Sequence, residues 1–223
     1  MQRKNPIVTG NVYHIMSKSI AGYQIFNTDA EYKRMIQMVR FFSYRKTFLK
    51  FSRCITFPIV QKKGFEEYLE ERFGEENKII QIIAYCLMPT HVHFVLKQLK
   101  EKGIETAIGN ILNAYSRYFN IKHKRQGPLW ASRFKNVPVD SDEQLLHLSR
   151  YVHLNPVSAG LINNAKQWKY SSYLEYVAPD AILHPLCSFH DLINERPSAY
   201  QAFVDDHANY QRELARIKKL ALE

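Results

Sequence analysis

The chain has 223 residues, of which 46% are hydrophobic, and it carries a formal net charge of +10. This length and hydrophobic fraction are enough for one ordinary folded domain with or without an appendage. The sequence shows no run of roughly 18 apolar residues that would span a membrane, no export signal, and no cysteine spacing typical of disulfide frameworks or zinc sites. We therefore expect a cytoplasmic protein whose positive charge attracts a polyanion, nucleic acid above all.

The first third of the chain predicts a strand, a helix and an insertion. Residues 11–19 alternate with the period of a strand, and residues 30–46 carry apolar side chains at helical spacing after a capping residue, Thr28 or Asp29. Residues 48–77 resemble an insertion that holds a short acidic helix closed by a glycine. No chemistry is predicted for this insertion.

The middle of the chain predicts two strands, a helix and a further strand. A nearly continuous apolar run at 78–89 indicates a buried strand, and residues 91–98 indicate its antiparallel partner across a short turn. Apolar residues on one stripe predict a helix over 104–123. A short strand follows at 134–139, and its internal proline favours an edge position.

The last predicted helix covers residues 140–155. It begins with a capping residue at Asp140 or Ser141. Pro156 predicts that this helix ends at or before Asn155, because the residue before a proline is biased away from the helical conformation.

The order of these elements predicts an α+β fold. Strand, helix, strand, strand, helix, strand is the split βαβ pattern of a ferredoxin-like antiparallel sheet with helices on one face, and the final helix is added to it. We expect residues 1–175 to form this domain and residues 176–223 to form a helical C-terminal extension.

Two histidines stand out in the predicted strand 91–98. With a period of two, His91 and His93 share one face while the apolar residues between and after them face the other way. Two neutral imidazoles on one face are a ready pair of metal ligands. The pattern alone is weak in a chain with nine histidines; one buried, hydrogen-bonded histidine beside one at the strand edge explains it equally well.

A candidate partner for the histidines lies in the helix 140–155. Tyr151 and Asn155 are four residues apart, so both side chains project from one side of the helix. A tyrosine hydroxyl is a possible covalent nucleophile, and an asparagine oxygen is a hard neutral ligand. Alternatively, Tyr151 packs in the core and Asn155 caps the helix end.

Three stretches taken together resemble a known family. "MPTHVHFVL" (88–96), "GPLWASRFKNVPVDSDEQLLHLSRYVHLNPVSAGLI" (127–162) and "WKYSSY" (168–173) are similar to the REP-associated tyrosine transposases, single-tyrosine transposases of the HUH class with an IS200-like fold. The likeness covers about residues 10–175. It implies a ferredoxin-like core that binds single-stranded DNA, often beside a hairpin, as a monomer or homodimer.

The resemblance also implies a site. Tyr151 corresponds to the nucleophile that becomes joined to a 5′ phosphate, and His91 and His93 correspond to ligands of Mg²⁺ or Mn²⁺. Asn155 occupies the place of a third, polar ligand, which is glutamine in some relatives.

Cations and aromatic residues interleave at 44–53 and 115–135, a combination that suits single-stranded nucleic acid because cations grip phosphates and aromatic rings stack on unpaired bases. Other tyrosines there are expected to pack in the core or stack on bases. His14 is expected to pack and His153 to contact solvent or DNA. The candidate DNA-binding residues are Lys122, Lys124, Arg125, Trp130, Arg133, Lys135 and Arg150, although Trp130 could equally plug the core.

The leading hypothesis is metal-dependent cleavage of single-stranded DNA and strand transfer through a 5′-phosphotyrosine, either in DNA transposition or in processing of hairpin-containing repeats. Two other hypotheses remain open. One is a nucleic-acid-binding module that has kept the fold without catalysis, and the other is a hydrolytic metal nuclease that uses activated water.

Overall fold

A computed structural model describes residues 6–45 and 49–207. Its centre is a four-stranded sheet in the order β2-β3-β1-β4, in which each neighbouring pair is antiparallel. The strands are β1 (Val12–Lys18), β2 (Ile80–Met88), β3 (His91–Gln98) and β4 (Lys135–Val139). This is the predicted ferredoxin-like sheet, with the proline-containing β4 at one edge.

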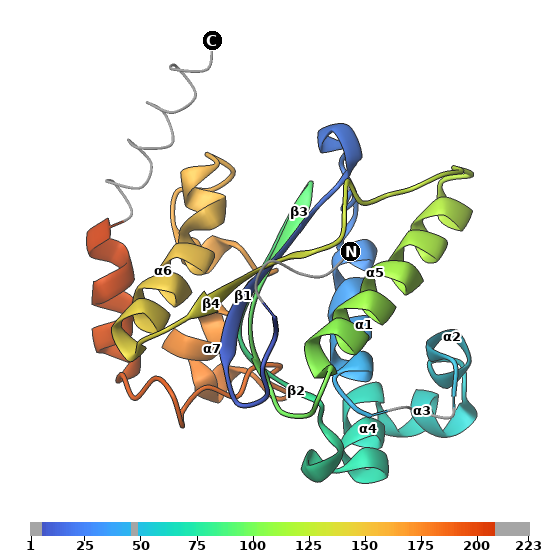
Figure 1. The fold of residues 1–223 in the computed structure, drawn as a ribbon, viewed down its shortest axis with the longest axis horizontal. Coiled ribbons are helices and arrows are strands. Elements are labelled where there is room, and N and C mark those ends of the chain that lie inside the picture. Colours follow the sequence, from blue (N-terminus) through green and yellow to red (C-terminus); the bar gives the residue numbers. More distant parts are fainter. Residues whose placement is uncertain (1–5, 46–48, 208–223) are drawn as a thin grey trace.

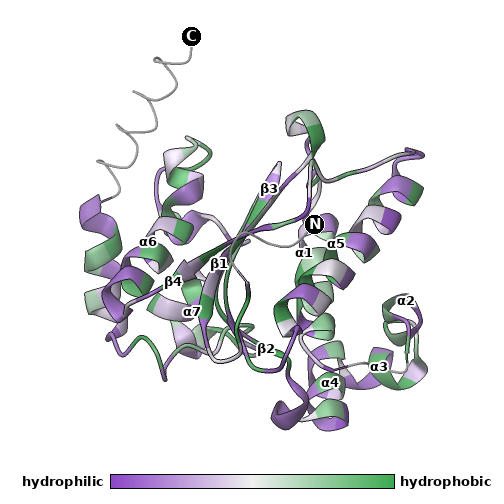
Figure 2. Ribbon diagram, in the orientation of Figure 1, coloured by the Kyte–Doolittle hydropathy of each residue, from purple (hydrophilic) through white to green (hydrophobic). Residues whose placement is uncertain are grey.

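Helices cover both faces of the sheet (Figure 1). The two helices of the ferredoxin-like pattern, α1 (Asp29–Phe42) and α5 (Gly103–Lys122), share one face. The opposite face is covered by α6 (Asp142–Ser158), the added helix, and by the short α7 (Tyr173–Val177). Figure 2 shows both hydrophobic and hydrophilic residues on α5 and α6, as amphipathic helices against a sheet require.

Side-chain alternation along β3 sorts its residues between the two layers. Val92, Phe94 and Leu96 belong to the hydrophobic cluster under α1 and α5, whereas Val95 belongs to the cluster under α6. The histidines of β3 share the parity of Val95 and therefore lie on the α6 side, which we call the histidine face. The prediction that they share one face is confirmed.

The insertion forms three short helices beside α1. They are α2 (Phe51–Cys54), α3 (Pro58–Lys63) and α4 (Phe65–Phe73), and α4 is the predicted acidic helix, ending at Gly74 with a positive φ of 64°. Their apolar side chains join the cluster under α1 and α5. Short 3₁₀ segments lie at Ile20–Gly22, Glu75–Asn77, Ala165–Gln167 and Pro179–Ala181.

The prediction that α6 stops before Pro156 is wrong, because the helix continues through Pro156 to Ser158. Proline has no N–H to offer the carbonyl of Val152. The Asn155 side-chain amide compensates, since its Nδ2 lies 3.5 Å from the Val152 oxygen and 2.8 Å from the Tyr151 oxygen. Burial of Pro156 and Val157 against the sheet favours the longer helix.

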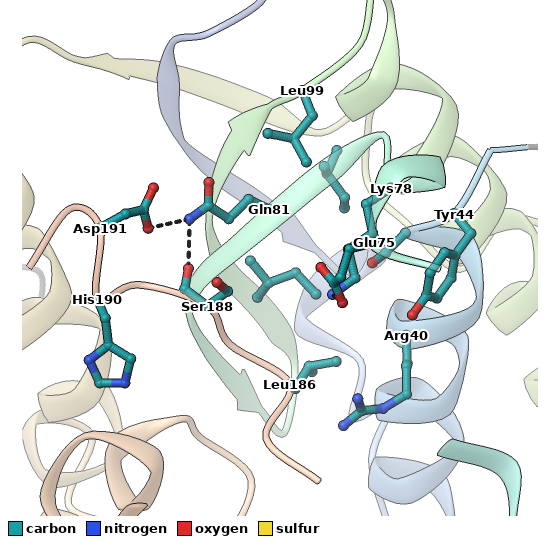
Figure 3. A pocket seen from close by; sticks show the side chains of 13 residues that line it. Arg40, Tyr44, Glu75, Lys78, Gln81, Leu99, Leu186, Ser188, His190 and Asp191 are labelled. Carbon is teal, nitrogen blue, oxygen red and sulfur yellow. Dashed lines mark hydrogen bonds and ion pairs between the residues drawn. The ribbon is translucent and has the colours of Figure 1, made fainter. Parts of the chain in front are cut away.

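The C-terminal segment packs onto the same layer as α6. Residues 197–207 are helical, and Tyr176, Phe189 and Tyr200 join the cluster under α6. Gln81, on edge strand β2, donates to the Ser188 carbonyl at 2.9 Å (Figure 3). The predicted boundary at 175 falls inside α7, and the C-terminal part of the predicted helical extension, 208–223, lies outside the described residues.

In the described part of the chain, no helix has the length and hydropathy to cross a membrane.

A buried carboxylate ties the start of α1 to the end of α5. Glu31 Oε2 accepts the backbone N–H of Asn27 at 2.5 Å and of Thr28 at 3.1 Å, while Oε1 accepts Lys122 Nζ at 2.8 Å and contacts His123 Nε2 at 2.6 Å. Burial alone raises the pKa of a carboxyl group, but the hydrogen bonds from Lys122, Asn27 and His123 lower the pKa of Glu31 to about 2. Glu31 therefore stabilises the fold as an anion.

Replacement of this carboxylate by an amide tests that role. We expect Glu31→Gln to lower the free energy of unfolding by about 2 kcal/mol at pH 7. Both carboxylate oxygens accept hydrogen bonds, whereas the NH₂ group of the amide cannot accept one and would face donors on its side. The pKa in the fold lies below the ordinary value of 4.5, so the wild-type advantage is complete above pH 4.5 and shrinks as the pH falls toward 2. Urea unfolding at several pH values measures it.

The matched control is Glu67→Gln, which makes the same change at an exposed first-turn position of α4. This variant should stay within about 0.5 kcal/mol of wild type. Equal losses for the two variants, or a Glu31→Gln loss that does not change with pH, would contradict the assignment.

Candidate active site

Three histidines meet on the histidine face. His91 and His93 come from β3, and His14 comes from the neighbouring β1. His14 Nε2 lies 3.0 Å from His93 Nδ1, and the two rings stack with centroids 5.2 Å apart. The ring of His91 stands edge-on to that of His93 at 5.0 Å, and His91 Nδ1 lies 3.0 Å from Thr90 Oγ1.

Tyr151 projects from α6 onto these rings. Its ring centroid is 5.9 Å from that of His93 and 6.1 Å from that of His14, edge-on in both cases. The side chain is 40% exposed, whereas His93 is 3% and His14 7% exposed. A single chain thus places an accessible phenol over buried imidazoles, as the predicted pairing of helix and sheet requires.

Asn155 lies one helical turn beyond Tyr151. Its Nδ2 donates to the Tyr151 carbonyl at 2.8 Å, so Oδ1 of the same amide points away from that carbonyl. The Asn155 side chain also interacts with the Tyr151 phenol. The structure therefore brings Tyr151 to His93 and His14 and places Asn155 one helical turn from Tyr151, and the role of Asn155 as a ligand stays a prediction.

The protonation states follow from burial. Burial lowers the pKa of His14 and of His91 to about 4, and burial together with the neighbouring His91 and His14 lowers the pKa of His93 further. Burial raises the pKa of Tyr151, and the interaction with Asn155 opposes this rise. At neutral pH the site consists of three uncharged imidazoles and a protonated phenol.

The hydrogen bonds to Nδ1 determine which ring nitrogens can bind a metal. If Nδ1–H of His91 donates to Thr90 Oγ1 and Nδ1–H of His93 donates to His14 Nε2, both Nε2 atoms carry a free lone pair. This is the usual arrangement of metal-binding histidines, whose second nitrogen donates to a neighbouring acceptor. His14 then carries its own proton on Nδ1.

The donor set is compatible with an ion that keeps open positions. Across 6–45 and 49–207, no three or more His, Cys, Asp or Glu side chains are placed to hold a metal ion. Two imidazoles and one amide oxygen fit an ion that completes its coordination with water and substrate phosphate, as Mg²⁺ often does. Imidazole suits transition metals better than it suits Mg²⁺, so the donors favour Mn²⁺.

The sheet also brings two lysines to the histidine face. Lys18 is paired with His91 across β1 and β3, and Lys135 is paired with Met16 across β1 and β4. Directly paired residues share a face, and both lysines are exposed. The sequence predicts DNA binding for Lys135. It gives no such indication for Lys18, although Lys18 shares the strand parity of His14.

Lys122 and Arg125, two predicted DNA-binding residues at the end of α5, have partners within the protein. Lys122 is paired with Glu31, and Arg125 donates to Asn120 Oδ1 at 3.1 Å and to the Pro128 carbonyl at 2.7 Å. Both hold the end of α5 and the loop after it. Lys124 and Arg133 are exposed in the same loop.

Trp130 is partly buried against the cluster under α1 and α5. Its Nε1 donates to the Leu112 carbonyl at 3.1 Å, and its ring lies 6.3 Å from that of Tyr115. This placement agrees with the alternative interpretation of Trp130 as a hydrophobic plug.

Arg150 is not brought to the histidines, although it precedes Tyr151. Its guanidinium carbon lies 4.0 Å from the ring centroid of Phe203, and Nη2 lies 2.8 Å from His147 Nδ1. Only 7% of Arg150 is exposed. This side chain fastens the C-terminal helix to α6.

The expectation that His153 contacts solvent or DNA is wrong. His153 is completely buried, with Nδ1 2.8 Å from the Tyr200 hydroxyl and Nε2 2.8 Å from Ser172 Oγ. Burial lowers the pKa of His153 to about 3. The aromatic residues that enclose it come from the C-terminal segment, which local sequence periodicity does not place.

Comparison with known proteins shows the class of protein to which this fold belongs. Residues 32–155, more than half of the chain, match the family described as "Transposase IS200 like". The chain belongs to this family, which confirms the resemblance drawn from its motifs and makes it a DNA-processing enzyme of the transposase type.

Two relatives extend the comparison. A Haemophilus influenzae protein named "Putative REP-associated tyrosine transposase" is 27% identical over an alignment of 151 residues, and the match covers 59% of this chain and 85% of the relative. A solved structure, described as a REP-associated tyrosine transposase bound to a REP hairpin, aligns with a TM-score of 0.53 and 12% identity. The alignment covers 84% of this chain and 92% of that structure's chain, and it supports the fold.

Proposed function

We propose that this protein cleaves single-stranded DNA and rejoins DNA ends through a covalent 5′-phosphotyrosine on Tyr151. The observation that carries this proposal is the accessible phenol of Tyr151 at 5.9 Å from the His93 ring, within one chain of an IS200-like transposase.

The covalent step exchanges one phosphate ester for another. Tyr151 Oη forms a bond to phosphorus, and the bond from phosphorus to the 3′ oxygen of the preceding nucleotide breaks. The phenol loses a proton and the departing 3′ oxygen gains one, so no net charge or electron is transferred. A 3′ hydroxyl of a second DNA end reverses the step and frees Tyr151, which makes the reaction strand transfer without a nucleotide cofactor.

His91 and His93, through Nε2, and Asn155, through Oδ1, are the residues that would hold Mg²⁺ or Mn²⁺. Such an ion neutralises a non-bridging phosphate oxygen and lowers the pKa of a nearby hydroxyl. The raised pKa of Tyr151 makes that assistance necessary at neutral pH.

His14 acts as a positioning residue in this proposal. Its Nε2 lies 3.0 Å from His93 Nδ1, and in the proposed tautomer it accepts the His93 Nδ1–H and so keeps His93 Nε2 unprotonated. With the remaining proton on its Nδ1, His14 has no lone pair for the phenol proton of Tyr151. The acceptor of that proton is therefore water or a substrate oxygen.

The proposed substrate is single-stranded DNA beside a hairpin. The solved relative is described as bound to a REP hairpin, and the exposed cations Lys18 and Lys135 at the histidine face suit a phosphate backbone. Because one chain supplies both the tyrosine and the histidines, we infer that a monomer is catalytically sufficient.

The test uses labelled single-stranded oligonucleotides with and without hairpins, incubated with Mg²⁺ or Mn²⁺. We expect a protein–DNA adduct that survives denaturation, with the nucleotide mapped to Tyr151 by mass spectrometry. Cleaved products in multiple turnover without an adduct would indicate a hydrolytic nuclease. Binding without cleavage in either metal would indicate a DNA-binding module.

A further inference from the structure

A second surface suited to DNA lies on the other side of the molecule. A groove of about 700 Å³ opens between α1, α5 and α2. These helices belong to the layer that covers the sheet opposite the histidine face. Volumes of roughly 300–1,000 Å³ are typical of small-molecule pockets, so the groove suits individual nucleotides rather than a duplex.

The charged side chains that line the groove in the described part of the chain are all positive. Arg34, Lys50, Arg117 and Lys122 line it, and no aspartate or glutamate among the described residues does. Glu31 neutralises Lys122 from outside the lining. Lys50 and Arg117 are exposed to solvent. The groove therefore attracts an anion without offering a carboxylate that repels it.

Apolar and aromatic side chains lie between these cations. The guanidinium of Arg34 stands 5.5 Å from the ring centroid of Phe51 and 5.2 Å from that of Tyr118. Ile121, which also lines the groove, is 80% exposed. An exposed isoleucine beside aromatic rings and cations matches a ligand with both flat apolar parts and negative charge.

The groove joins two stretches that are far apart in the chain. Residues 44–53 and 115–135 both interleave cations and aromatic residues, and α2 and α5 bring members of both to one place. Their convergence is a property of the tertiary structure.

We propose that this groove binds unpaired nucleotides of the DNA substrate, with phosphates at Lys50 and Arg117 and bases against Tyr118 and Ile121. This inference rests on the proposed function for the identity of the ligand. A duplex hides its base faces and cannot use the apolar part of the groove. The groove adds affinity and orientation, and it takes no part in bond breaking.

The chain itself links the groove to the active site. α5 ends at Lys122, and residues 123–134 lead from there into β4, whose Lys135 is on the histidine face. DNA held at both places is anchored at two points. Two anchors fix the direction in which the strand crosses Tyr151.

Binding measurements with a Tyr151→Phe background test the groove without any cleavage. In fluorescence anisotropy with a labelled single-stranded oligonucleotide, we expect Arg117→Glu to weaken binding about tenfold. The logarithm of the association constant should fall less steeply with the logarithm of the salt concentration. This slope should become shallower by about 0.7 for each phosphate that the variant no longer binds. The matched control is Arg72→Glu, an exposed cation on α4 that does not line the groove. It should change affinity less than about twofold.

Equal weakening by Arg117→Glu and Arg72→Glu would show that net charge alone matters and would overturn the proposal. Unlabelled single strand must also compete better than duplex of equal length, and equal competition would remove the role of the bases. Acidic lipid vesicles should not compete, and full displacement by them would assign the groove to a membrane surface.

Photocrosslinking locates the bases directly. With 5-bromodeoxyuridine in the oligonucleotide, mass spectrometry should find DNA joined to peptides containing Tyr118 or Phe51. Crosslinks confined to peptides of β1, β3 and α6 would overturn the groove while leaving the active site intact. Because neither measurement needs cleavage, a failed groove and a failed phosphotyrosine mechanism give different results.

Discussion

We expect Tyr151→Phe to abolish the covalent protein–DNA adduct and to reduce cleavage by roughly 10⁴-fold or more. The change removes only the hydroxyl oxygen that is the proposed nucleophile, and the ring keeps its edge contacts with His93 and His14. Since the side chain is 40% exposed, the free energy of unfolding should change by less than about 0.5 kcal/mol. Denaturing electrophoresis of labelled DNA measures the adduct.

Tyr23→Phe is the matched control. Tyr23 is 46% exposed and lies under the Arg125 guanidinium at 5.4 Å, so it loses the same hydroxyl at a similar exposure away from the histidines. Cleavage by this variant should stay near the wild-type rate. An adduct that persists in Tyr151→Phe would defeat the assignment of the nucleophile.

A mixing experiment tests whether one chain is sufficient. Tyr151→Phe and His91→Ala are both expected to be inactive, and an equimolar mixture should remain inactive because each molecule uses its own tyrosine and histidines. Recovery of cleavage in the mixture would show that two chains share a site.

We expect His14→Ala to lower the affinity for Mn²⁺ by about 10- to 100-fold, although His14 is not proposed as a ligand. The reason is the 3.0 Å contact between His14 Nε2 and His93 Nδ1, which orients the His93 ring and selects its tautomer. His14→Gln should recover part of the affinity, because an amide oxygen can accept the same hydrogen bond. Calorimetric titration with Mn²⁺, without DNA, measures the change independently of activity.

His184→Ala is the control for this measurement. His184 is exposed, and its backbone carbonyl accepts the hydrogen bond from Arg40, so the side chain can be removed while that bond stays in place. Its Mn²⁺ affinity should equal that of wild type. Unchanged affinity in His14→Ala, or equal losses in the alanine and glutamine variants, would contradict the positioning role.

Local periodicity was sufficient to predict which of the candidate side chains share a face. A strand places His91 and His93 on one face whatever its neighbours are, and a helix places Tyr151 and Asn155 on one side. The expectation for Pro156 failed for a local reason of its own, because the Asn155 amide supplies the donors that proline lacks.

Contacts between residues far apart in the sequence decided where three other side chains lie. His14 reaches His93 through the antiparallel register of β1 against β3. His153 is enclosed by residues from the C-terminal segment, and Arg150 stacks on Phe203 of the last described helix. None of these partners is close in the sequence, so no spacing rule indicates them.

The sequence by itself determined the order of strands and helices, the ferredoxin-like pattern, and which chemically active side chains share a local face. Those properties depend on backbone periods and on turn residues, which act over a few positions. Only the tertiary structure decided which faces meet: the helix of Tyr151 over the histidines, His14 beside His93, and two cationic stretches around one groove. The physical reason is that strand register and helix packing are set by burial of side chains far apart in the chain.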